Sequence, residues 1–215
     1  MVLGIYGAGG LGREVYILAK KINQNRSRWT EIVFIDDANN ITEMQGKRVL
    51  TLSAIVQEYS ELEVVIAVGE PSVREILYKR VKEHDISLAT VIHPQIYIDE
   101  TTKIGDGVVI CEGVTITCDV TIGDNSYIQP HAVIGHDISI GMHTVISANC
   151  HIGGTNKIGN RVYMGFLSGT KEHLTIGNDV ICSAGAIVFR DMPDEVIAVG
   201  NPARIMKKNE EKKVF

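Results

Sequence analysis

Residues 128–158 read IQPHAVIGHDISIGMHTVISANCHIGGTNKI, and an isoleucine returns at every sixth position of this stretch. An α-helix repeats about every 3.6 residues and a strand about every 2, so neither period explains this spacing. A strict six-residue period is typical of a parallel β-helix. The complete frame consists of Ile92, Ile98, Ile104, Ile110, Ile116, Ile122, Ile128, Ile134, Ile140, Ile146, Ile152 and Ile158, followed by Met164, Thr170, Ile176, Cys182 and Val188.

The same frame predicts which side chains point inward. Three hexapeptides form one triangular coil, so residues eighteen apart are expected to lie one above the other. The position two residues before each frame residue is mostly small or β-branched, which suits a narrow interior. Asn156 is an exception, and we expect it to pair within the coil. Glycine commonly follows the frame residue, as at Gly135 and Gly153, where a tight corner favours a residue without Cβ.

The residues before the frame follow a different pattern, in which strands and helices alternate. Strands are predicted at 3–7, 31–37 and 63–69, and helices at 9–21, 52–59 and 71–84. This order predicts a small parallel sheet of the Rossmann kind. We therefore expect an α/β Rossmann-like N-terminal domain at 1–88 and a β-helix domain at 89–215, the latter closed at its end by residues 189–206.

Charge and composition limit the possible partners. The 215 residues carry a formal net charge of −5, which argues against nucleic acid as a partner. No stretch is long and apolar enough for a membrane span, and the N-terminus lacks the pattern of a signal peptide. The four cysteines contain no CxxC pair and fit a reducing compartment. A cytoplasmic protein is expected.

A glycine-rich motif, GAGGLG at residues 7–12, follows the first predicted strand and opens the first helix. It fits G-x-G-x-x-G, in which glycines let the backbone approach a phosphate at the positive end of the helix. Asp36 and Asp37 end the second strand, where a carboxylate can hold a ribose or a base, and Gly69 ends the third. A tight structural turn without a ligand is the alternative interpretation of the motif.

His136 is the strongest candidate for chemistry in the coil. It lies two residues after Ile134, off the inward position, and Gly154 follows eighteen residues later, one rung above. A glycine stacked on a histidine leaves space and an N–H beside the imidazole, as a general base next to an oxyanion donor requires. Asp137 follows His136 and is placed to hold the other ring nitrogen.

Ala148, Phe166 and Ala184 form a second column, also at intervals of eighteen residues. Two small side chains flank a large one, which predicts either a shelf for an extended thioester arm or ordinary packing between subunits. Past the coil, residues 200–204 read GNPAR. Alone, this segment predicts only a turn.

These pieces together resemble the left-handed β-helix acyltransferases, and most closely the family of sialic acid O-acetyltransferases and bacterial nucleotide-4-amino-sugar N-acetyltransferases. The resemblance covers nearly the whole chain. It rests on IYGAGGLGREV (5–15), FIDD (34–37), AVGEPSVR (67–74), VIHP (91–94), VIGHD (133–137) and VGNPARIM (199–206).

The resemblance implies an acetyl-CoA-dependent enzyme that acts on a nucleotide-linked 4-amino-sugar, with UDP as the expected nucleotide. It assigns His136 as general base, Asp137 as its partner and the Gly154 N–H as oxyanion donor. Further implied contacts are Gly9, Gly10, Leu11, Asp36, Asp37 and Gly69 for the nucleotide sugar, and Val145, Phe166, Ala184, Asn201, Pro202 and Arg204 for the cofactor. It also implies a homotrimer without a metal.

Two departures from the family pattern concern histidines. Many relatives carry histidine where this chain has Leu11, and a second family histidine corresponds to Val145, with His143 two residues away. We therefore expect altered contacts to the sugar and near the thioester. His131, His143 and His151 are interpreted as solvated or interface residues.

Three alternatives to this activity remain at the level of sequence. O-acetylation of sialic acid or a related sugar would use the same base. A γ-type carbonic anhydrase would use His131 and His136, but its third zinc ligand would fall on Gln95, which is not histidine. A sensor that binds nucleotide sugar without catalysis would keep the N-terminal motif and show no dependence on CoA.

Overall fold

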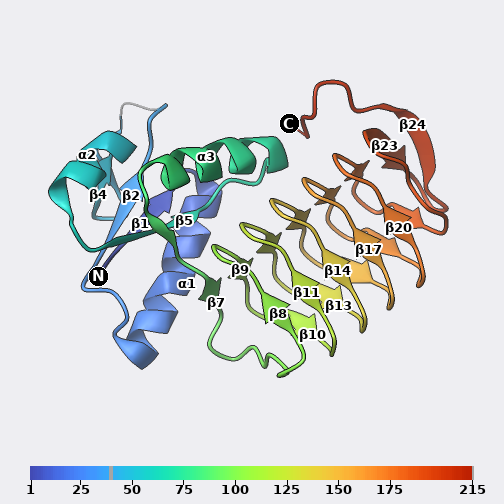
Figure 1. The fold of residues 1–215 in the computed structure, drawn as a ribbon, viewed down its shortest axis with the longest axis horizontal. Coiled ribbons are helices and arrows are strands. Elements are labelled where there is room, and N and C mark those ends of the chain that lie inside the picture. Colours follow the sequence, from blue (N-terminus) through green and yellow to red (C-terminus); the bar gives the residue numbers. More distant parts are fainter. Residues whose placement is uncertain (39–40, 215) are drawn as a thin grey trace.

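The computed structural model describes residues 1–38 and 41–214, and Phe215 of the second predicted domain lies outside these residues. Figure 1 shows two parts, an α/β unit and a coil of short strands that extends away from it. No helix in the described part of the chain is both long and apolar enough to cross a membrane.

The N-terminal unit is a six-stranded sheet with helices on both faces. Its strand order is β3-β4-β2-β1-β5-β6, with β1, β2 and β5 parallel. Leu3 and Ile5 of β1 pack on the side of α1, whereas Val2 and Tyr6 pack on the side of α2 and α3, so both faces are buried. The elements are β1 (Val2–Tyr6), α1 (Gly10–Arg26), β2 (Glu31–Ile35), β3 (Glu43–Met44), β4 (Lys47–Leu50), α2 (Leu52–Glu58), β5 (Leu62–Ile66), α3 (Pro71–Glu83) and β6 (Ser87–Leu88).

The Rossmann-like prediction is confirmed, with shifts at the element ends. α1 continues to Arg26, five residues beyond the predicted end, and stops at Ser27, which takes the left-handed conformation. The strands β3, β4 and β6 were not predicted. β3 and β4 form a short hairpin whose turn residues, Gln45 and Gly46, both have positive φ. Its strands are short and largely polar, so the sequence lacks the apolar run that marks a strand.

The second part is a parallel β-helix with three faces, as the six-residue frame predicts. Face 1 contains β7 (Val91–Ile92), β9 (Val109–Ile110), β12 (Tyr127–Ile128), β15 (Val145–Ile146), β18 (Tyr163–Met164), β21 (Ile181–Cys182), β23 (Val196–Val199) and β24 (Arg204–Lys208). Face 2 contains β10 (Thr115–Ile116), β13 (Val133–Ile134), β16 (His151–Ile152), β19 (Gly169–Thr170) and β22 (Ile187–Val188). Face 3 contains β8 (Lys103–Ile104), β11 (Thr121–Ile122), β14 (Ser139–Ile140), β17 (Lys157–Ile158) and β20 (Thr175–Ile176).

Strands of one face pair with partners eighteen residues away, so Ile134 lies between Ile116 and Ile152. The apolar frame residues from Ile110 onward form one buried core inside the coil. Asn156 is fully buried there, and its amide donates to the carbonyl oxygens of Gly153 and Lys171, both at 2.8 Å. The expectation that Asn156 pairs within the coil is confirmed.

The glycines that follow the frame residues are needed for close backbone approach. A Cβ on Gly135 would come within 2.9 Å of the Gly154 nitrogen, in the next rung. The left-handed backbone conformation falls two residues later, for example at Asp137 (φ 57°) and His143 (φ 60°). Aspartate, asparagine and histidine tolerate this region better than most residues.

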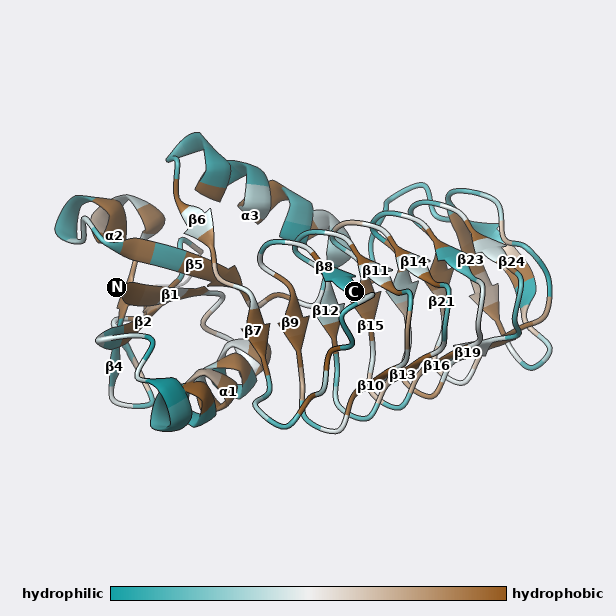
Figure 2. Ribbon diagram, turned by 60° about the horizontal axis from the view of Figure 1, so that its bottom comes forward, coloured by the Kyte–Doolittle hydropathy of each residue, from teal (hydrophilic) through white to brown (hydrophobic). Residues whose placement is uncertain are grey.

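The two parts are joined along the corner between face 3 and face 1, which we call the α3 corner. Arg74 of α3 is fully buried there; its guanidinium donates to the carbonyl oxygens of Ile66 and Val68, both at 2.9 Å, and to the carbonyl and side-chain oxygens of Asn125, both at 2.8 Å. The Arg74 side chain thus links the sheet edge to the coil. In Figure 2, α3 lies alongside the coil.

Two further contacts hold α3 to the coil. The His143 ring lies edge-on to Tyr78 at 5.0 Å, and Arg161 lies 3.5 Å from Glu75 and forms a bidentate pair with Asp179. β6 is the last strand of the N-terminal sheet and β7 the first of the coil. The proposed domain boundary between residues 88 and 89 falls in the connection between them.

The C-terminal end of the coil is closed by β23 and β24. β23 continues face 1 by pairing with β21, and β24 pairs with it antiparallel. The chain then returns along the α3 corner, where Lys212 lies 2.8 Å from Glu195 and the Val214 N–H donates to Glu70 of the β5–α3 connection at 2.8 Å.

Candidate active site

The glycine-rich loop joins β1 to α1. Two of its glycines are required by the turn, and the other two leave open space above the backbone. Gly7 has φ 122°, and a Cβ on Gly12 would overlap the Gly7 carbonyl oxygen, so both positions require glycine for the turn. A Cβ on Gly9 would meet nothing within 4 Å, and one on Gly10 would meet only the Arg13 side chain, at 3.9 Å. The space over Gly9 and Gly10 is therefore open to a ligand.

The start of α1 is suited to an anion. Gly9 is the N-cap, no side chain caps the helix, and no acidic residue lies in its first turn. The unpaired N–H groups at a helix start attract a phosphate. Leu11, by contrast, is partly buried against the core around α1, so it offers no polar contact, as expected from its departure from the family pattern.

A cleft of about 390 Å³ lies beside this loop at the carboxyl edge of the sheet. Its lining includes Asp36, Asp37 and Arg80 together with aliphatic side chains of α3 and the β5–α3 connection. Asp37 accepts hydrogen bonds from the Tyr6 hydroxyl and from the Leu52 N–H. Burial and the Asp37 carboxylate raise the pKa of Tyr6 to about 12, so this hydroxyl stays protonated as a donor.

Asp36 orders the loop that ends β2. Its carboxylate accepts from the Ala38 N–H at 2.9 Å and from the Ala8 N–H at 3.4 Å, so it ties β2 to the glycine-rich loop. Gly69 lies in the connection from β5 to α3 and belongs to the same edge. The structure thus brings together the loop, both aspartates and the β5 end, as parallel strands of this topology require.

His136 lies on the corner between face 2 and face 3, between β13 and β14; we call it the His136 corner. Its Nδ1 lies 2.7 Å from the Asp137 carboxylate, and its side chain is 61% exposed. Because a carboxylate only accepts, the neutral tautomer that fits this contact carries its proton on Nδ1 and its lone pair on Nε2.

Gly154 lies directly above this ring. A Cβ on Gly154 would come within 2.7 Å of His136 Nε2, so only glycine leaves the edge of the imidazole free. The Gly154 N–H has no hydrogen-bond acceptor among residues 1–38 and 41–214. A basic nitrogen and a free N–H donor therefore lie side by side on an exposed corner.

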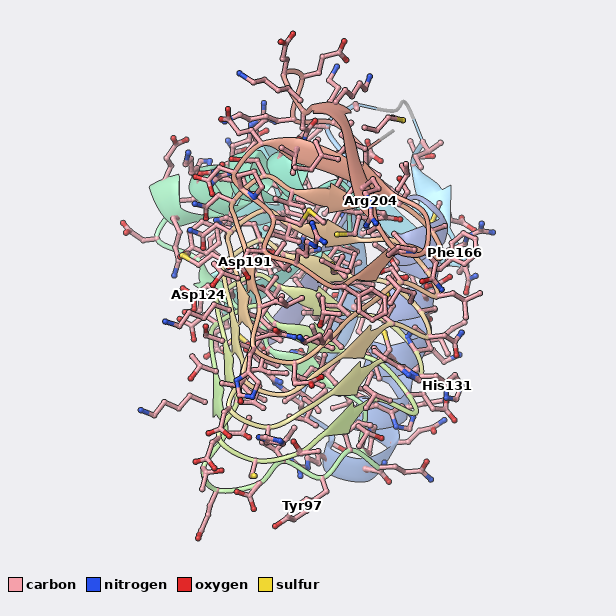
Figure 3. The ribbon with its side chains drawn as sticks, turned by 90° about the vertical axis from the view of Figure 1, so that its right-hand side faces the viewer. Tyr97, Asp124, His131, Phe166, Asp191 and Arg204 are labelled. Atoms are coloured by element: carbon pink, nitrogen blue, oxygen red, sulfur yellow. The ribbon has the colours of Figure 1, made fainter. Side chains whose placement is uncertain are left out.

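The column predicted for a thioester arm lies on the corner between face 1 and face 2, the Phe166 corner. Phe166 is 56% exposed and Ala184 is exposed as well. The turn from Asn201 to Arg204 continues the column, because the Ala203 N–H donates to the Ile187 carbonyl oxygen at 2.8 Å. Phe166 and His131 project from the same side of the coil, opposite Asp124 and Asp191 (Figure 3).

Val145 does not join this column. It points outward from face 1, stacks between Tyr127 and Tyr163 and has no exposed surface, because α1 and the sheet cover it. His143 is nearly as buried, and burial lowers its pKa to about 4, so it is neutral at pH 7. The structure therefore brings neither residue to an exposed corner.

Within one chain, the predicted catalytic residues of the coil lie apart from its predicted cofactor-binding residues. His136 and Gly154 lie at the far end of face 2, and Phe166 and Ala184 lie where face 2 begins. His131 and His136 are likewise at opposite ends of β13. In the described parts of the chain, no three histidine, cysteine or acidic side chains gather in the way that a metal ion requires.

A charged cluster next to α1 was not predicted from the sequence. Lys21 contacts Glu112 at 2.5 Å, and the buried His93 ring lies 3.5 Å from Lys21 and 3.6 Å from Glu112. The available signal was the placement of Glu14 and Lys21 seven residues apart on one helix face, beside the exposed Ile17.

Comparison with known proteins finds likeness along the whole chain. A family model of the PglD N-terminal domain matches residues 2–81, and a model of the bacterial transferase hexapeptide (six repeats) matches residues 119–154. GDP-perosamine N-acetyltransferase of Escherichia coli is 28% identical over 213 residues, which are 96% of each chain.

Solved structures show the same likeness. A mutant of perosamine N-acetyltransferase from Caulobacter crescentus, in complex with CoA and GDP-perosamine, superposes with a TM-score of 0.89 at 27% identity, over 97% of this chain and 98% of that one. The acetyltransferase domain of PglB from Neisseria gonorrhoeae superposes with a TM-score of 0.87 at 26% identity, over 95% and 99%.

Proposed function

We propose that this chain, which belongs to the left-handed β-helix acyltransferases of the nucleotide-amino-sugar N-acetyltransferase family, transfers an acetyl group from acetyl-CoA to the amine of a nucleotide-linked amino sugar. The observation that carries the proposal is the pairing of His136 Nε2 with the free N–H of Gly154 on one exposed corner. The E. coli relative, named GDP-perosamine N-acetyltransferase, and the C. crescentus structure in complex with CoA and GDP-perosamine support it.

The proposed reaction is a direct transfer. The amine attacks the thioester carbonyl while His136 Nε2 takes the proton that the nitrogen loses. The carbonyl oxygen becomes an oxyanion and accepts a hydrogen bond from the Gly154 N–H. Collapse of the tetrahedral intermediate breaks the carbon–sulfur bond, and the leaving thiolate takes the proton from the imidazolium. Asp137 keeps Nδ1 protonated throughout.

The substrates are assigned to separate parts of the chain. The nucleotide is proposed to place its phosphates over Gly9 and Gly10 and its base and ribose in the cleft of Asp36 and Asp37, with Gly69 beside them. CoA is proposed to run along the Phe166 corner, past Phe166 and Ala184, to the turn of Asn201, Pro202 and Arg204. Val145 is left out of this surface because it is buried.

A homotrimer is part of the proposal. The base lies on one corner of the coil and the CoA column on another, so a site that uses both needs two copies of the chain. Cyclic assembly of three copies around the coil axis places the His136 corner of one copy against the Phe166 corner of the next. Each of the three sites is then complete.

For the nucleotide, the proposal places GDP before UDP. The sequence resemblance favours UDP, whereas the E. coli relative that matches 96% of this chain is named for GDP-perosamine. Since that protein is matched end to end, we give GDP priority.

The test is release of thiol from acetyl-CoA in the presence of GDP-perosamine, a UDP-linked 4-amino-sugar or free sialic acid, with the product identified by mass. Release with one nucleotide sugar is expected, and His136→Ala is expected to reduce kcat by about 10²–10⁴-fold. His84→Ala, at an exposed position after α3, is the control. Release only with sialic acid would move the assignment to O-acetylation. Binding without any release would favour the sensor.

A further inference from the structure

Residues 209–214 link the closed end of the coil to the N-terminal domain, and we call this segment the C-terminal strap. It follows β24, which begins at the end of the turn from Asn201 to Arg204. In Figure 1 the C-terminal end of the chain lies beside the start of α3. The strap thus runs from the cap of the coil to the domain that carries the nucleotide cleft.

The first anchor of the strap is Asn209. It is only 4% exposed, although both of its neighbours in the chain are exposed. Its side-chain amide donates to the Asp179 carbonyl oxygen at 2.9 Å, and its main-chain N–H donates to the Glu195 carbonyl oxygen at 2.9 Å. Because a buried amide that loses its partners is costly, the strap starts from a fixed point.

Lys212 continues the attachment. Its ammonium lies 2.8 Å from Glu195 and 3.4 Å from Asp179. The hydrogen bond to Glu195 and the charge of Asp179 raise the pKa of Lys212, so this side chain stays charged at neutral pH. Asp179 also forms the bidentate pair with Arg161, which faces Glu75 of α3. The strap therefore belongs to the charged network of the α3 corner.

The second anchor lies on the N-terminal domain. The Val214 N–H donates to the Glu70 carboxylate at 2.8 Å, and these residues are 144 positions apart in the chain. Glu70 is the N-cap residue of α3, but its side chain forms no capping hydrogen bond with the helix. Its carboxylate instead accepts from Val214 and, at 3.5 Å, from the Ser72 hydroxyl.

Glu70 ends the β5–α3 connection, which borders the nucleotide cleft. Val68 lies two residues earlier and lines the cleft together with Val73 of α3. Val68 also packs on the glycine-rich loop, since a Cβ on Gly7 would come within 3.1 Å of its Cγ2 atom. Arg74 donates to the Val68 carbonyl oxygen at 2.9 Å. The connection is thus held by Arg74 on one side and by the strap at its end.

We propose that the C-terminal strap, through Glu70, positions the β5–α3 connection for the nucleotide of the acceptor. The proposal rests on the function proposed above, because it takes this cleft as the nucleotide site. Without the strap the connection has more conformations, and the apparent affinity falls with the fraction of chains that hold the binding conformation. Glu70 does not line the cleft itself, so it acts as a positioning residue.

The test removes the hydrogen bond between Val214 and Glu70 from either side. Val214→Pro deletes the donated N–H, and Glu70→Ala deletes the acceptor. Calorimetric Kd values are measured for GDP, UDP and CoA on the full chain. Each variant is expected to weaken the nucleotide that wild type prefers by roughly 3- to 10-fold, the effect of one hydrogen bond to a carboxylate, and to leave CoA within about twofold.

Two matched controls keep the hydrogen bond. Val214→Ala retains the N–H and Glu70→Gln retains an oxygen acceptor, so both should keep nucleotide affinity within about twofold. The double variant Glu70→Ala/Val214→Pro should bind no more weakly than the weaker single variant, because both changes remove the same contact. In turnover, KM for the nucleotide sugar should rise in the test variants while kcat and KM for acetyl-CoA stay unchanged.

Hydrogen exchange gives a second measurement of the same effect. Amides of residues 67–70 should exchange faster in Val214→Pro than in Val214→Ala, whereas amides of β12 and β15 in the coil should exchange equally in both. Faster exchange throughout the chain would indicate general destabilisation and would overturn the positioning role.

The outcomes separate this proposal from the proposed function. Unchanged nucleotide affinity in the test variants, additive losses in the double variant, or an equal loss of CoA affinity would overturn the role of the strap. Turnover with unaltered nucleotide Kd in the variants would leave the transferase standing and the strap refuted. Weakened nucleotide binding in a protein that releases no thiol would support the strap and refute the transferase. A wild type that binds neither GDP nor UDP would refute both.

Discussion

Gly154 lies one rung above His136, so close that a Cβ on Gly154 would come within 2.7 Å of the imidazole Nε2. The two residues are eighteen apart in the chain and are brought together only by the pitch of the coil. Their contact leaves the ring edge free and sets the Gly154 N–H beside it. Any side chain at residue 154 must displace the imidazole.

Gly154→Ala should therefore lower kcat with little loss of stability. The exposed His136 ring can rotate away from the new methyl group, so the fold is spared while the base moves. A displacement of about 1 Å is enough for a loss on the order of 10²-fold. Steady-state kinetics with acetyl-CoA measure the change, and chemical denaturation is the control. Unchanged kcat would separate Gly154 from catalysis.

Asp137→Asn should reduce kcat by roughly 10- to 100-fold and leave both KM values nearly unchanged. Asparagine tolerates the positive φ of this position, so the backbone stays in place. Its amide can donate to Nδ1 as well as accept, and donation moves the ring proton to Nε2, where the base is needed. A variant with wild-type kcat would show that Asp137 does not control the tautomer.

Arg74→Met should lower the free energy of unfolding by about 3 kcal/mol, because it leaves buried carbonyl oxygens of both domains without donors. The affected acceptors are the main-chain oxygens of Ile66 and Val68 and the two oxygens of Asn125. Urea denaturation measures the loss. Arg190→Met, at an exposed position, is the control and should change stability by less than about 0.5 kcal/mol. Equal stability of both variants would contradict the role of Arg74 as a domain link.

Stability should fall as the pH drops below about 6.5, partly because of His143. Burial lowers its pKa to about 4 in the folded chain, so between that value and about 6.5 the unfolded chain binds the additional proton. The free energy of unfolding therefore rises with pH in this window, and the contribution between pH 7 and pH 5 is about 2 kcal/mol.

His143→Asn tests this assignment, since asparagine accepts the positive φ of residue 143. Its denaturation midpoint should vary less between pH 7 and pH 5 than that of wild type. His84→Asn, at an exposed site, should keep the full dependence. An unaltered slope in His143→Asn would assign the effect to another group, such as His93, whose pKa is also lowered by burial.

The coil and the contact between His136 and Gly154 could be predicted, because the six-residue frame shows the rung in which a residue lies and the direction in which its side chain points. Counting eighteen from His136 is sufficient to find Gly154. The same counting does not say which outward positions another element covers. Val145, which was expected to contact the cofactor, is one such position, because it is buried where the domains meet.

A signal for this junction was nevertheless present in the chain. The outward positions of face 1 are apolar from Val91 onward, unlike the threonine, lysine and serine of face 3. At the α3 corner, the polar column Asn125, His143, Arg161 and Asp179 repeats at intervals of eighteen residues. Both columns predict a covering element. Neither reveals that α1 and the sheet cover face 1 while α3 covers the corner, because that depends on how a separate domain docks.

The rung spacing fixes a length as well as a shape. Pro130, which shares its rung with His136, is followed by Ala148, Phe166, Ala184 and Pro202 at intervals of eighteen residues. These four steps of about 4.8 Å place the turn that closes the coil roughly 19 Å above the rung of His136. Gain or loss of one eighteen-residue rung would change that height by one step and leave every side chain facing as before. An insertion into the coil frame that is not a multiple of eighteen residues would rotate the corners out of register. The height available to an acyl donor in this architecture therefore changes in steps of one whole rung.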